Sequence, residues 1–444
     1  MVNNMLLFLV GVLIFILPIP HTISIRNISA ILILLSVIFL WKQYKNYKMN
    51  NKLKKIFYIL AILTIWIFIV AFFISNETKW SLNEIRGQWI TPILYIICFI
   101  LLAIYSSYQD NSFQKNIYSV IFLMFFIHIL YIDLYALKYY LEHKIMISRF
   151  GGLTGGPDKA NYLTNILLSF IVAEIIYRFK TKKYYLNINN LILLLIIILT
   201  IASSIFEGVR NGVVAIIFIG VSGIFFSFYQ NNYLSKQTKI IMSLILIMSL
   251  SIPAIYNFKK DNRWNTLIET IPIALNTKSN QAWINSKQHP YPKLSNGQTV
   301  SESNYLRIAW FYEGLKLIME NPLGLGFGRN AFGHGIKNKY NLEKHIGHSH
   351  SGLIDLGVGI GIPGLLIWSF FCFYLMYISF IYFKKYNSYF SIILFFNITG
   401  FFSRFLVDSN MRDHMLETFF IIVGFSLIYM LNEKYEKNNP TSSQ

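Results

Sequence analysis

The sequence predicts an all-α integral membrane protein, and three features lead to that fold class. Of the 444 residues, 55% are hydrophobic and only 13% are charged, whereas an average soluble domain has about 25% charged residues. Uninterrupted apolar runs recur along the chain, and most approach the roughly 20 residues that a helix needs to cross about 30 Å of hydrocarbon. Lysine-rich connections follow several of the even-numbered runs, which is the charge pattern of loops that stay in the cytoplasm.

The apolar runs predict about twelve transmembrane helices. They lie at 5–20, 28–41, 56–75, 89–106, 117–137, 161–177, 187–206, 212–228, 239–255, 352–383, 388–407 and 415–431. The first run lacks a basic segment before it and a small-residue cleavage pattern after it, so we expect it to remain as a span.

One long hydrophilic segment divides these helices into two groups. We therefore expect helices 1–9 in residues 1–255, a large loop over 256–350 that contains short amphipathic helices, helices 10–12 in 351–431 and a tail over 432–444. A hydrophilic segment of this length far exceeds the usual few-residue connection, and long loops on a rigid scaffold often carry function.

The positions of the lysines predict the orientation of the chain. The connection "KQYKNYKMNNKLKK" carries six lysines, and "RFKTKK" and "SKQTK" follow later even-numbered runs. By the positive-inside rule these connections and both termini face the cytoplasm, and the large loop faces outward. These lysines supply much of the net charge of +19, and no basic stripe interleaved with aromatic residues appears in a soluble segment, so nucleic-acid binding is not predicted.

The second half of the large loop predicts a surface helix followed by a tight turn. In "SNYLRIAWFYEGLKLIMENPLG", Ile308, Phe311, Leu315 and Ile318 recur at helical spacing, with Ser303 as the expected cap. The pattern favours an amphipathic helix along the membrane surface. The glycines at 324, 326 and 328 follow, and since no strand precedes them, a tight turn is favoured over a phosphate loop.

Three charged clusters stand at the outer edges of the predicted spans. They are Glu207 with Arg210 in "SSIFEGVRNG", Arg149 with Asp158 and Lys159 in "SRFGGLTGGPDKANYLTN", and Arg404, Asp408, Arg412, Asp413 and His414 in "SRFLVDSNMRDHMLE". Charges at membrane depth are costly and usually face a polar cavity, so each cluster is a functional candidate. For Arg404 and Arg412, snorkelling of the side chain to the interface is an equal alternative.

Four histidines, His334, His345, His348 and His350, fall in one short stretch before the tenth span. A metal site is not predicted, because no cysteine partner and no His-Glu-x-x-His helix accompany them. A histidine is also the commonest general base near neutral pH. The pair in "GHSHSG" is expected in an extended segment, where positions two apart point the same way. A purely hydrogen-bonded, interfacial role for either histidine stays open.

The quoted motifs together resemble the O-antigen ligase family. The turn "GVRNG", the loop segment "YLRIAWFYEGLKLIMENPLGLGFGRNAF" and the helix start "HSHSGLIDLGVGIGIPGLLIW" carry the resemblance, which covers chiefly residues 149–420. Arg210, Arg307 and the pair His348 and His350 are its sharpest parts. Ser351 stands where members often have Asn.

The resemblance implies a GT-C-like glycosyltransferase in the bacterial inner membrane. It would transfer undecaprenyl-pyrophosphate-linked O-antigen to lipid A-core on the periplasmic face, without a cofactor or a metal. By the same resemblance His350 is the base, assisted by His348. Arg210, Arg307 and Arg149 would bind the pyrophosphate. The residues that would bind the acceptor or support the site are Glu207, Arg329, Arg412 and Asp408.

Other functions remain open at this stage. O-antigen polymerases and protein O-oligosaccharyltransferases share much of this pattern. A polysaccharide transporter would use a similar bundle, although no internal repeat of the kind common in transporters is visible. A structural membrane protein would not need arginines and histidines to converge on one face.

Overall fold

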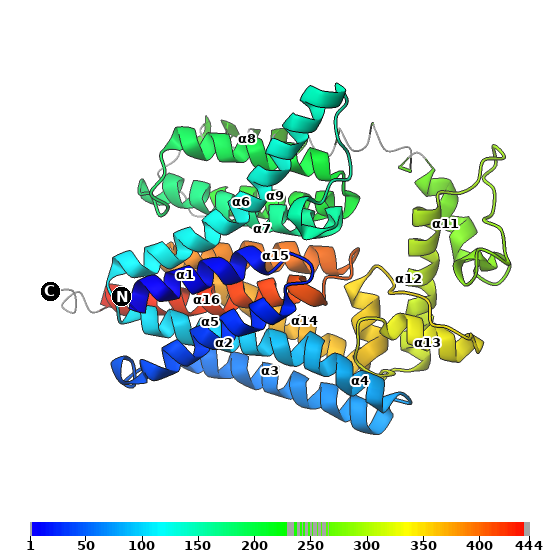
Figure 1. The fold of residues 1–444 in the computed structure, drawn as a ribbon, viewed down its shortest axis with the longest axis horizontal. Helices are drawn as coiled ribbons and strands as arrows, with labels where there is room; N and C mark the ends of the chain where they lie inside the picture. The colour runs from blue at the N-terminus through cyan, green and yellow to red at the C-terminus, as the bar shows by residue number, and fades with distance from the viewer. Residues whose placement is uncertain are drawn as a thin grey trace.

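The computed structural model describes residues 2–228 and 266–438, together with scattered positions between 235 and 264. Within this part of the chain the secondary structure is helical, apart from an isolated antiparallel bridge between Lys293 and Thr299. Most helices run side by side in one bundle, and three helices of the large loop lie at one end of it (Figure 1).

The helices of the bundle follow the apolar runs of the sequence. The first nine are α1 (Val2–Ile16), α2 (Ile23–Phe39), α3 (Asn51–Ile69), α4 (Thr78–Ile85), α5 (Thr91–Ser107), α6 (Asn111–His143), α7 (Pro157–Thr181), α8 (Asn190–Glu207) and α9 (Arg210–Phe228). The last three are α14 (Gly352–Tyr386), α15 (Tyr389–Phe405) and α16 (Asp413–Asn438). The large loop forms α11 (Leu267–Leu275), α12 (Glu302–Glu320) and α13 (Ala331–Tyr340).

A helix stands at each predicted span except the ninth, at 239–255, which lies largely outside the described residues. Among the described residues, seven helical segments are long and apolar enough to cross a membrane: Asn51–Ile74, Thr78–Ser107, Asn111–His143, Pro157–Thr181, Asn190–Glu207, Gly352–Tyr386 and Asp413–Glu433. The helices α1, α2, α9 and α15 are also apolar but shorter. The protein is therefore a multi-pass membrane protein, and twelve spans stay a prediction.

The centre of the bundle is α16, whose apolar window is 100% buried. A helix that is hydrophobic on all sides has no face for solvent and belongs inside a protein. It packs against α5 and α15, with Phe419 and Phe420 against the buried ring of Trp368 on α14. Both cysteines, Cys98 and Cys372, are buried in this core as free thiols.

The two ends of the bundle carry different parts of the chain. The start of α1 and the end of α16 lie at one end, and α11, α12 and α13 lie at the other (Figure 1). The lysine-rich connection lies at the same end as the start of α1. Its Gln43 bonds Gln109, just after α5, and Tyr105 in the last turn of α5 bonds Asn3 of α1. The side of the membrane that each end faces stays a prediction.

The glycine-rich turn after α12 docks into a break in α14. Gly361 has a φ of 68° and interrupts the helix two residues before Pro363. The backbone of the turn fills the gap: Leu325 N donates to Val358 O at 2.9 Å, and Ile362 N donates to Pro322 O at 2.8 Å. A Cβ on Gly361 would lie 2.3 Å from Pro322 O. The glycines thus return the chain to the bundle at close backbone contact.

The predicted apolar face of α12 is only partly buried against the protein, and its contact with a membrane surface stays a prediction. Phe311 and Leu315 are 36% and 40% exposed, whereas Ile318 is buried. The face that packs on the bundle carries Gly314, which lies against Ile354 of α14, where a Cβ would come within 2.2 Å of the isoleucine side chain. The expected cap is displaced too. The residue before the helix is Ser301, and Ser303 lies inside it.

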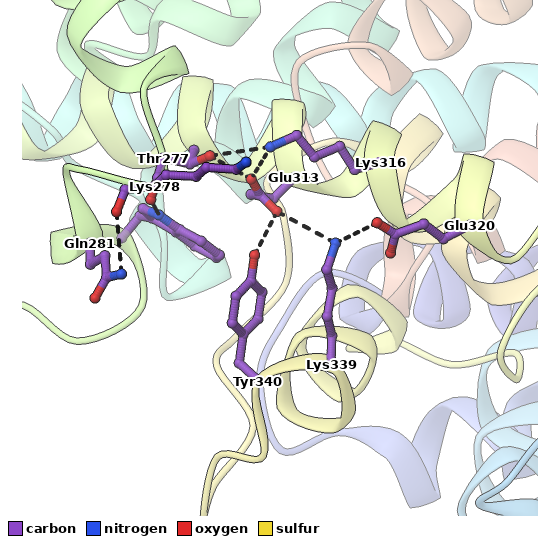
Figure 2. A network of polar contacts seen from close by, with 9 residues as sticks. Thr277, Lys278, Gln281, Glu313, Lys316, Glu320, Lys339 and Tyr340 are labelled. Carbon is purple, nitrogen blue, oxygen red and sulfur yellow. Dashed lines mark hydrogen bonds and ion pairs between the residues drawn. The ribbon is translucent and has the colours of Figure 1, made fainter.

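A buried carboxylate holds the three loop helices together. Glu313 of α12 is 1% exposed and accepts hydrogen bonds from Thr277 Oγ1 at 2.5 Å, Lys316 Nζ at 2.6 Å and Tyr340 OH at 3.1 Å (Figure 2). Lys339 of α13 lies 3.9 Å from it. Burial raises the pKa of Glu313, but the bonds from Lys316 and Thr277 outweigh burial and hold the pKa below its ordinary value. The ionised carboxylate therefore stabilises the loop.

We expect Glu313→Gln to lower stability by about 2 kcal/mol, because charge-assisted hydrogen bonds contribute more than neutral ones. The measurement is the apparent melting temperature of the detergent-solubilised protein at neutral pH. Glu320→Gln is the matched control, since Glu320 is half exposed and pairs with Lys339 alone. Equal melting temperatures for the two variants would contradict the anchoring role of Glu313.

Candidate active site

The turn between α8 and α9 fixes the start of the site. Gly208 ends α8 with a φ of 59°, a left-handed conformation that glycine adopts without steric cost. Arg210 is the first residue of α9. Gly212 lies so close to Asn161 of α7 that a Cβ would stand 1.8 Å from the amide oxygen. The left-handed backbone therefore favours a glycine at position 208, and close packing against α7 requires one at position 212.

Two arginines brace α9 and α12 against each other. Arg210 donates from Nη1 to Asn304 Oδ1 at 2.6 Å and from Nη2 to Ser303 Oγ at 3.1 Å. Arg307, one turn further along α12, donates from Nη1 to Asn211 Oδ1 at 2.8 Å. Each arginine therefore binds the helix that carries the other, and two residues far apart in the sequence lie together.

Further charges surround Arg307. Its Nη1 also donates to the carbonyl of Val407 at 3.2 Å. Burial holds the pKa of Arg307 below its ordinary value, and the carboxylates of Asp408 and Asp158 partly offset this effect. Arg149 adds a like charge nearby. It lies against Gly208 with a φ of 59°, so its backbone is left-handed although it is not a glycine.

The histidine pair lies just before α14, with a backbone that differs from the prediction. His350 has a φ of 59° and is left-handed, not extended. Ser351 then caps the helix by accepting from Ile354 N at 3.4 Å. The two imidazoles nevertheless lie side by side, with ring centroids 4.3 Å apart. Trp310 of α12 stacks on His350 with centroids 5.8 Å apart and planes 8° apart.

Asp355, in the first turn of α14, binds the backbone of the histidine motif. Its Oδ1 accepts from the backbone N of Ser349, between the two histidines, at 2.9 Å. Its Oδ2 accepts from Ser409 Oγ at 2.5 Å. Since Ser409 belongs to the α15–α16 connection, one carboxylate in the first turn of α14 positions the histidine motif relative to that connection.

Both histidines are neutral at pH 7. Burial and the charge of His350 lower the pKa of His348 to about 3, and burial and the guanidinium of Arg307 lower that of His350 to about 4. Arg412 acts in the same direction on both, while Asp408 opposes it. A neutral imidazole has a free lone pair and can accept a proton.

A buried polar network lies beneath these residues. Arg404 is 0% exposed, so the snorkelling alternative is wrong for it. Its guanidinium pairs with Asp408 and donates to Asn161 Oδ1 at 2.9 Å. Asn161 Nδ2 donates in turn to Glu207 Oε2 at 2.7 Å. Glu207, which Thr164 also binds, is thus sealed in the support of the site and is bonded to α7.

Two other predicted site residues, Arg329 and Arg412, bond carboxylates of α4 and α16. Arg329 donates from Nε and Nη2 to the two oxygens of Glu84 at 3.0 Å each, and these bonds raise its pKa. Arg329 also lies 3.6 Å from Asp413. Arg412 donates from Nε to Asp413 at 3.2 Å, and its Nη1 is buried without a hydrogen-bond partner.

The other two histidines of the predicted stretch, His334 and His345, stack on each other beside Trp80. His334 of α13 stacks between Trp80 and His345 and bonds Glu77 at 2.9 Å. Within the described part of the chain, no three His, Cys, Asp or Glu residues are arranged to hold a metal ion.

Residues 191–369 match the family model described as O-antigen ligase. This segment of the chain is similar to the O-antigen ligase family. The matched segment includes Arg210, Arg307 and both histidines, whereas Arg149, Asp408 and Arg412 lie outside it. No curated protein matches the chain.

Several residues of this matched segment were not singled out from the sequence. Asn304 and Asn211 orient the arginines, and Trp310 stacks on His350. A signal was present for the two asparagines, because Asn211 follows Arg210 directly and Asn304 precedes Arg307 by one helical turn. No sequence pattern pairs Trp310 with His350, since that contact depends on how α12 packs.

We expect Gly212→Ala to destabilise the protein by about 1–3 kcal/mol, because the added methyl group must displace Asn161 from both Arg404 and Glu207. Gly347→Ala is the control, since a Cβ there meets nothing within 4 Å. The measurement is the melting temperature of the two purified variants. An unchanged melting temperature for Gly212→Ala would show that α7 and α9 are less closely packed than described.

Proposed function

We propose that the protein is an O-antigen ligase that transfers undecaprenyl-pyrophosphate-linked O-antigen to a sugar hydroxyl of lipid A-core, on the periplasmic face of a bacterial inner membrane. One observation carries the proposal. Two mutually braced arginines and a neutral histidine pair meet at one end of a membrane-embedded helical bundle, within the segment that matches the O-antigen ligase family.

The arginines are suited to the donor. A pyrophosphate diester carries two negative charges, and guanidinium groups are permanently charged forks that match phosphate oxygens. Arg307 and Arg210 would bind it, with Arg149 as a third cation. The asparagine bonds fix the orientation of both forks before the donor arrives, so little reorganisation is needed when charge develops in the transition state.

The histidines are suited to the acceptor. His350 takes the proton of the acceptor hydroxyl, whose oxygen forms the new bond to the anomeric carbon. The bond between that carbon and the pyrophosphate oxygen breaks, and undecaprenyl pyrophosphate leaves with the electron pair. The proton then passes from the imidazolium to water. His348 and Asp355 orient His350 and its backbone, which are positioning roles.

Transfer in one step with inversion is the simplest stereochemistry. A retaining enzyme would need a carboxylate nucleophile close to the anomeric carbon. Asp408 is paired with Arg404, and Asp355 accepts hydrogen bonds on both of its oxygens. The developing negative charge is neutralised by arginines, so the proposed mechanism does not require a metal. The energy comes from the pyrophosphate linkage of the donor, because nucleotide sugars are absent from the periplasm.

An O-antigen polymerase is the alternative, since it would use the same donor chemistry on a lipid-linked glycan acceptor. A protein O-oligosaccharyltransferase differs likewise in the acceptor alone. A polysaccharide transporter is less well supported, because it would not need a proton acceptor beside the arginines.

Deletion of the gene tests the proposed function. Lipopolysaccharide gels of the deletion strain should lack all ligated O-antigen and recover it with the wild-type gene. His350→Ala should fail to restore it, since a general base contributes about 10²–10⁴-fold in rate. Arg210→Lys and Arg307→Lys should restore it poorly, because lysine keeps the charge but loses the fork. His348→Ala should be milder.

Core bearing a single repeat unit in the deletion strain would instead indicate a polymerase. Full complementation by both lysine variants would remove the pyrophosphate role of the arginines. Immunoblots of membrane fractions would establish that each variant accumulates like the wild type.

We expect kcat/KM of the purified enzyme to stay flat from about pH 8 down to about pH 5.5, because the pKa of His350 lies near 4 in the free enzyme and not near the ordinary value of about 6.5. An imidazole with a lowered pKa stays neutral until the pH approaches that pKa. Arg412→Gln removes a like charge and should move the acidic fall in kcat/KM to higher pH. A wild-type midpoint near pH 6.5 would be incompatible with the buried, arginine-flanked His350.

A further inference from the structure

The indole ring of Trp310 faces the imidazole of His350. The two ring centroids lie 5.8 Å apart and their planes differ by 8°, which is an offset-stacked arrangement of the kind that aromatic rings prefer. The imidazole of His348 is a second ring neighbour of His350, and it is tilted by 57°. Trp310 thus lies parallel to the proposed base, on the helix that the two arginines join to α9.

Trp310 is itself held in place by the first half of the large loop. Its Nε1 donates to the carbonyl of Trp283 at 3.0 Å. Trp283 is 2% exposed, and its own Nε1 donates to the carbonyl of Thr277 at 3.1 Å. Thr277 belongs to the Glu313 network of Figure 2. A side chain that is fixed by packing and by a hydrogen bond can hold its neighbour in one geometry.

The proposed base needs an orienting group. A general base must direct its lone pair at the proton that it takes, and a catalytic histidine is usually oriented by a hydrogen bond to a third group. Among the described residues, the imidazole of His350 contacts two rings, and no hydrogen bond to it is found. The plane of the imidazole is therefore set by its ring contacts, and Trp310 supplies the parallel one.

The indole ring also suits the charge that His350 gains. On taking a proton the imidazole becomes a cation, and Arg307 and Arg412 already place positive charge near it. Asp408 opposes them but is engaged in an ion pair. The face of an indole ring has a negative potential that attracts cations, and its N–H group is a donor only. Trp310 can therefore stabilise the charged imidazole without competing for the proton.

We propose that Trp310 is a positioning residue for His350: its indole ring fixes the plane of the imidazole and stabilises the charge that the base gains in the reaction. The inference rests on the proposed glycosyl transfer and adds to it a residue that acts through the base. The loss of such a residue slows the chemical step and leaves the binding of both substrates intact.

The first test compares the kinetic constants of purified full-length variants. Trp310→Leu removes the ring, whereas Trp310→Phe keeps a ring without the N–H group that bonds Trp283. The donor is an undecaprenyl-pyrophosphate-linked glycan. The acceptor is lipopolysaccharide lacking O-antigen or a lipid-linked repeat unit, whichever the wild type uses. Trp310→Leu should lower kcat about tenfold and leave each KM within about twofold. Trp310→Phe should recover part of the lost kcat.

Phe311→Leu is the matched control. Phe311 is the next residue of the same helix and is 36% exposed, so its loss should change neither kcat nor KM. If Trp310→Leu does not accumulate in membranes, Trp310→Met takes its place, because methionine also lacks a ring and fills irregular space in apolar surroundings.

The second test observes the imidazole directly. The chain has nine histidines, and each gives an NMR signal when histidine is enriched at Cε1 with the NMR-active carbon isotope. The signal that is lost in His350→Ala belongs to His350. Trp310→Leu should move this signal, Trp310→Phe should move it less, and Phe311→Leu should leave it in place. A general loss of structure would instead move the signals of distant histidines as well.

The outcomes separate this inference from the proposed function. Absence of transfer by the wild type, or full activity of His350→Ala, would refute the proposed function itself. When the wild type transfers glycan and His350→Ala does not, three results would refute the role of Trp310 alone. These are an unchanged kcat in the ringless variant, an unmoved His350 signal, and a rise in donor KM as large as the fall in kcat.

Discussion

The reciprocal bracing of α9 and α12 is the interaction on which the rest of the site depends. Arg210 binds α12 through Ser303 and Asn304, while Arg307 binds α9 through Asn211. Without these bonds the large loop would meet this part of the bundle through apolar contacts, which are not directional. The bonds fix α12 in one register, and that register brings Trp310 onto His350. The orientation of the cations and the environment of the base therefore share one cause.

The buried network below the site explains why so many charges can be tolerated there. A buried ion pair is costly to desolvate unless further hydrogen bonds satisfy both partners. Arg404 pairs with Asp408 and donates to Asn161, so its two terminal nitrogens are bonded, whereas its Nε has no partner among the described residues. Glu207 accepts hydrogen bonds from Asn161 and Thr164. One asparagine connects the two, so three bundle helices are held at fixed distances beneath the arginines. Such rigid support favours a preorganised site.

Hydropathy predicted most of the bundle, because a bilayer imposes a minimum length on each apolar run, and every described helix of the bundle except the short α4 overlaps one of these runs. The sequence also singled out Arg210, Arg307 and the histidine pair, since charges beside membrane spans are rare and costly, while their roles stay predictions. The full buried face of α12 was not predicted, because close contact at Gly314, and not the apolar pattern alone, decides it. The left-handed backbone of His350 was not predicted either. A glycine is expected at such a position, and the two flanking glycines drew the prediction away from the histidine.

If the proposed reaction takes place at the histidines, the break at Gly361 would set its height above the hydrocarbon. Beyond it, Ile362–Tyr386 is a continuous helical segment, and at 1.5 Å per residue it extends about 37 Å, enough to cross a bilayer unaided. The helical segment 352–360 before the break is therefore not needed for crossing. At 1.5 Å per residue it would hold the histidine motif about 13 Å farther along the helix than the break. A polyprenyl chain could remain dissolved in the acyl layer while its head group rises to the histidines. The enzyme would then need to lift only the pyrophosphate, and never the lipid, out of the membrane.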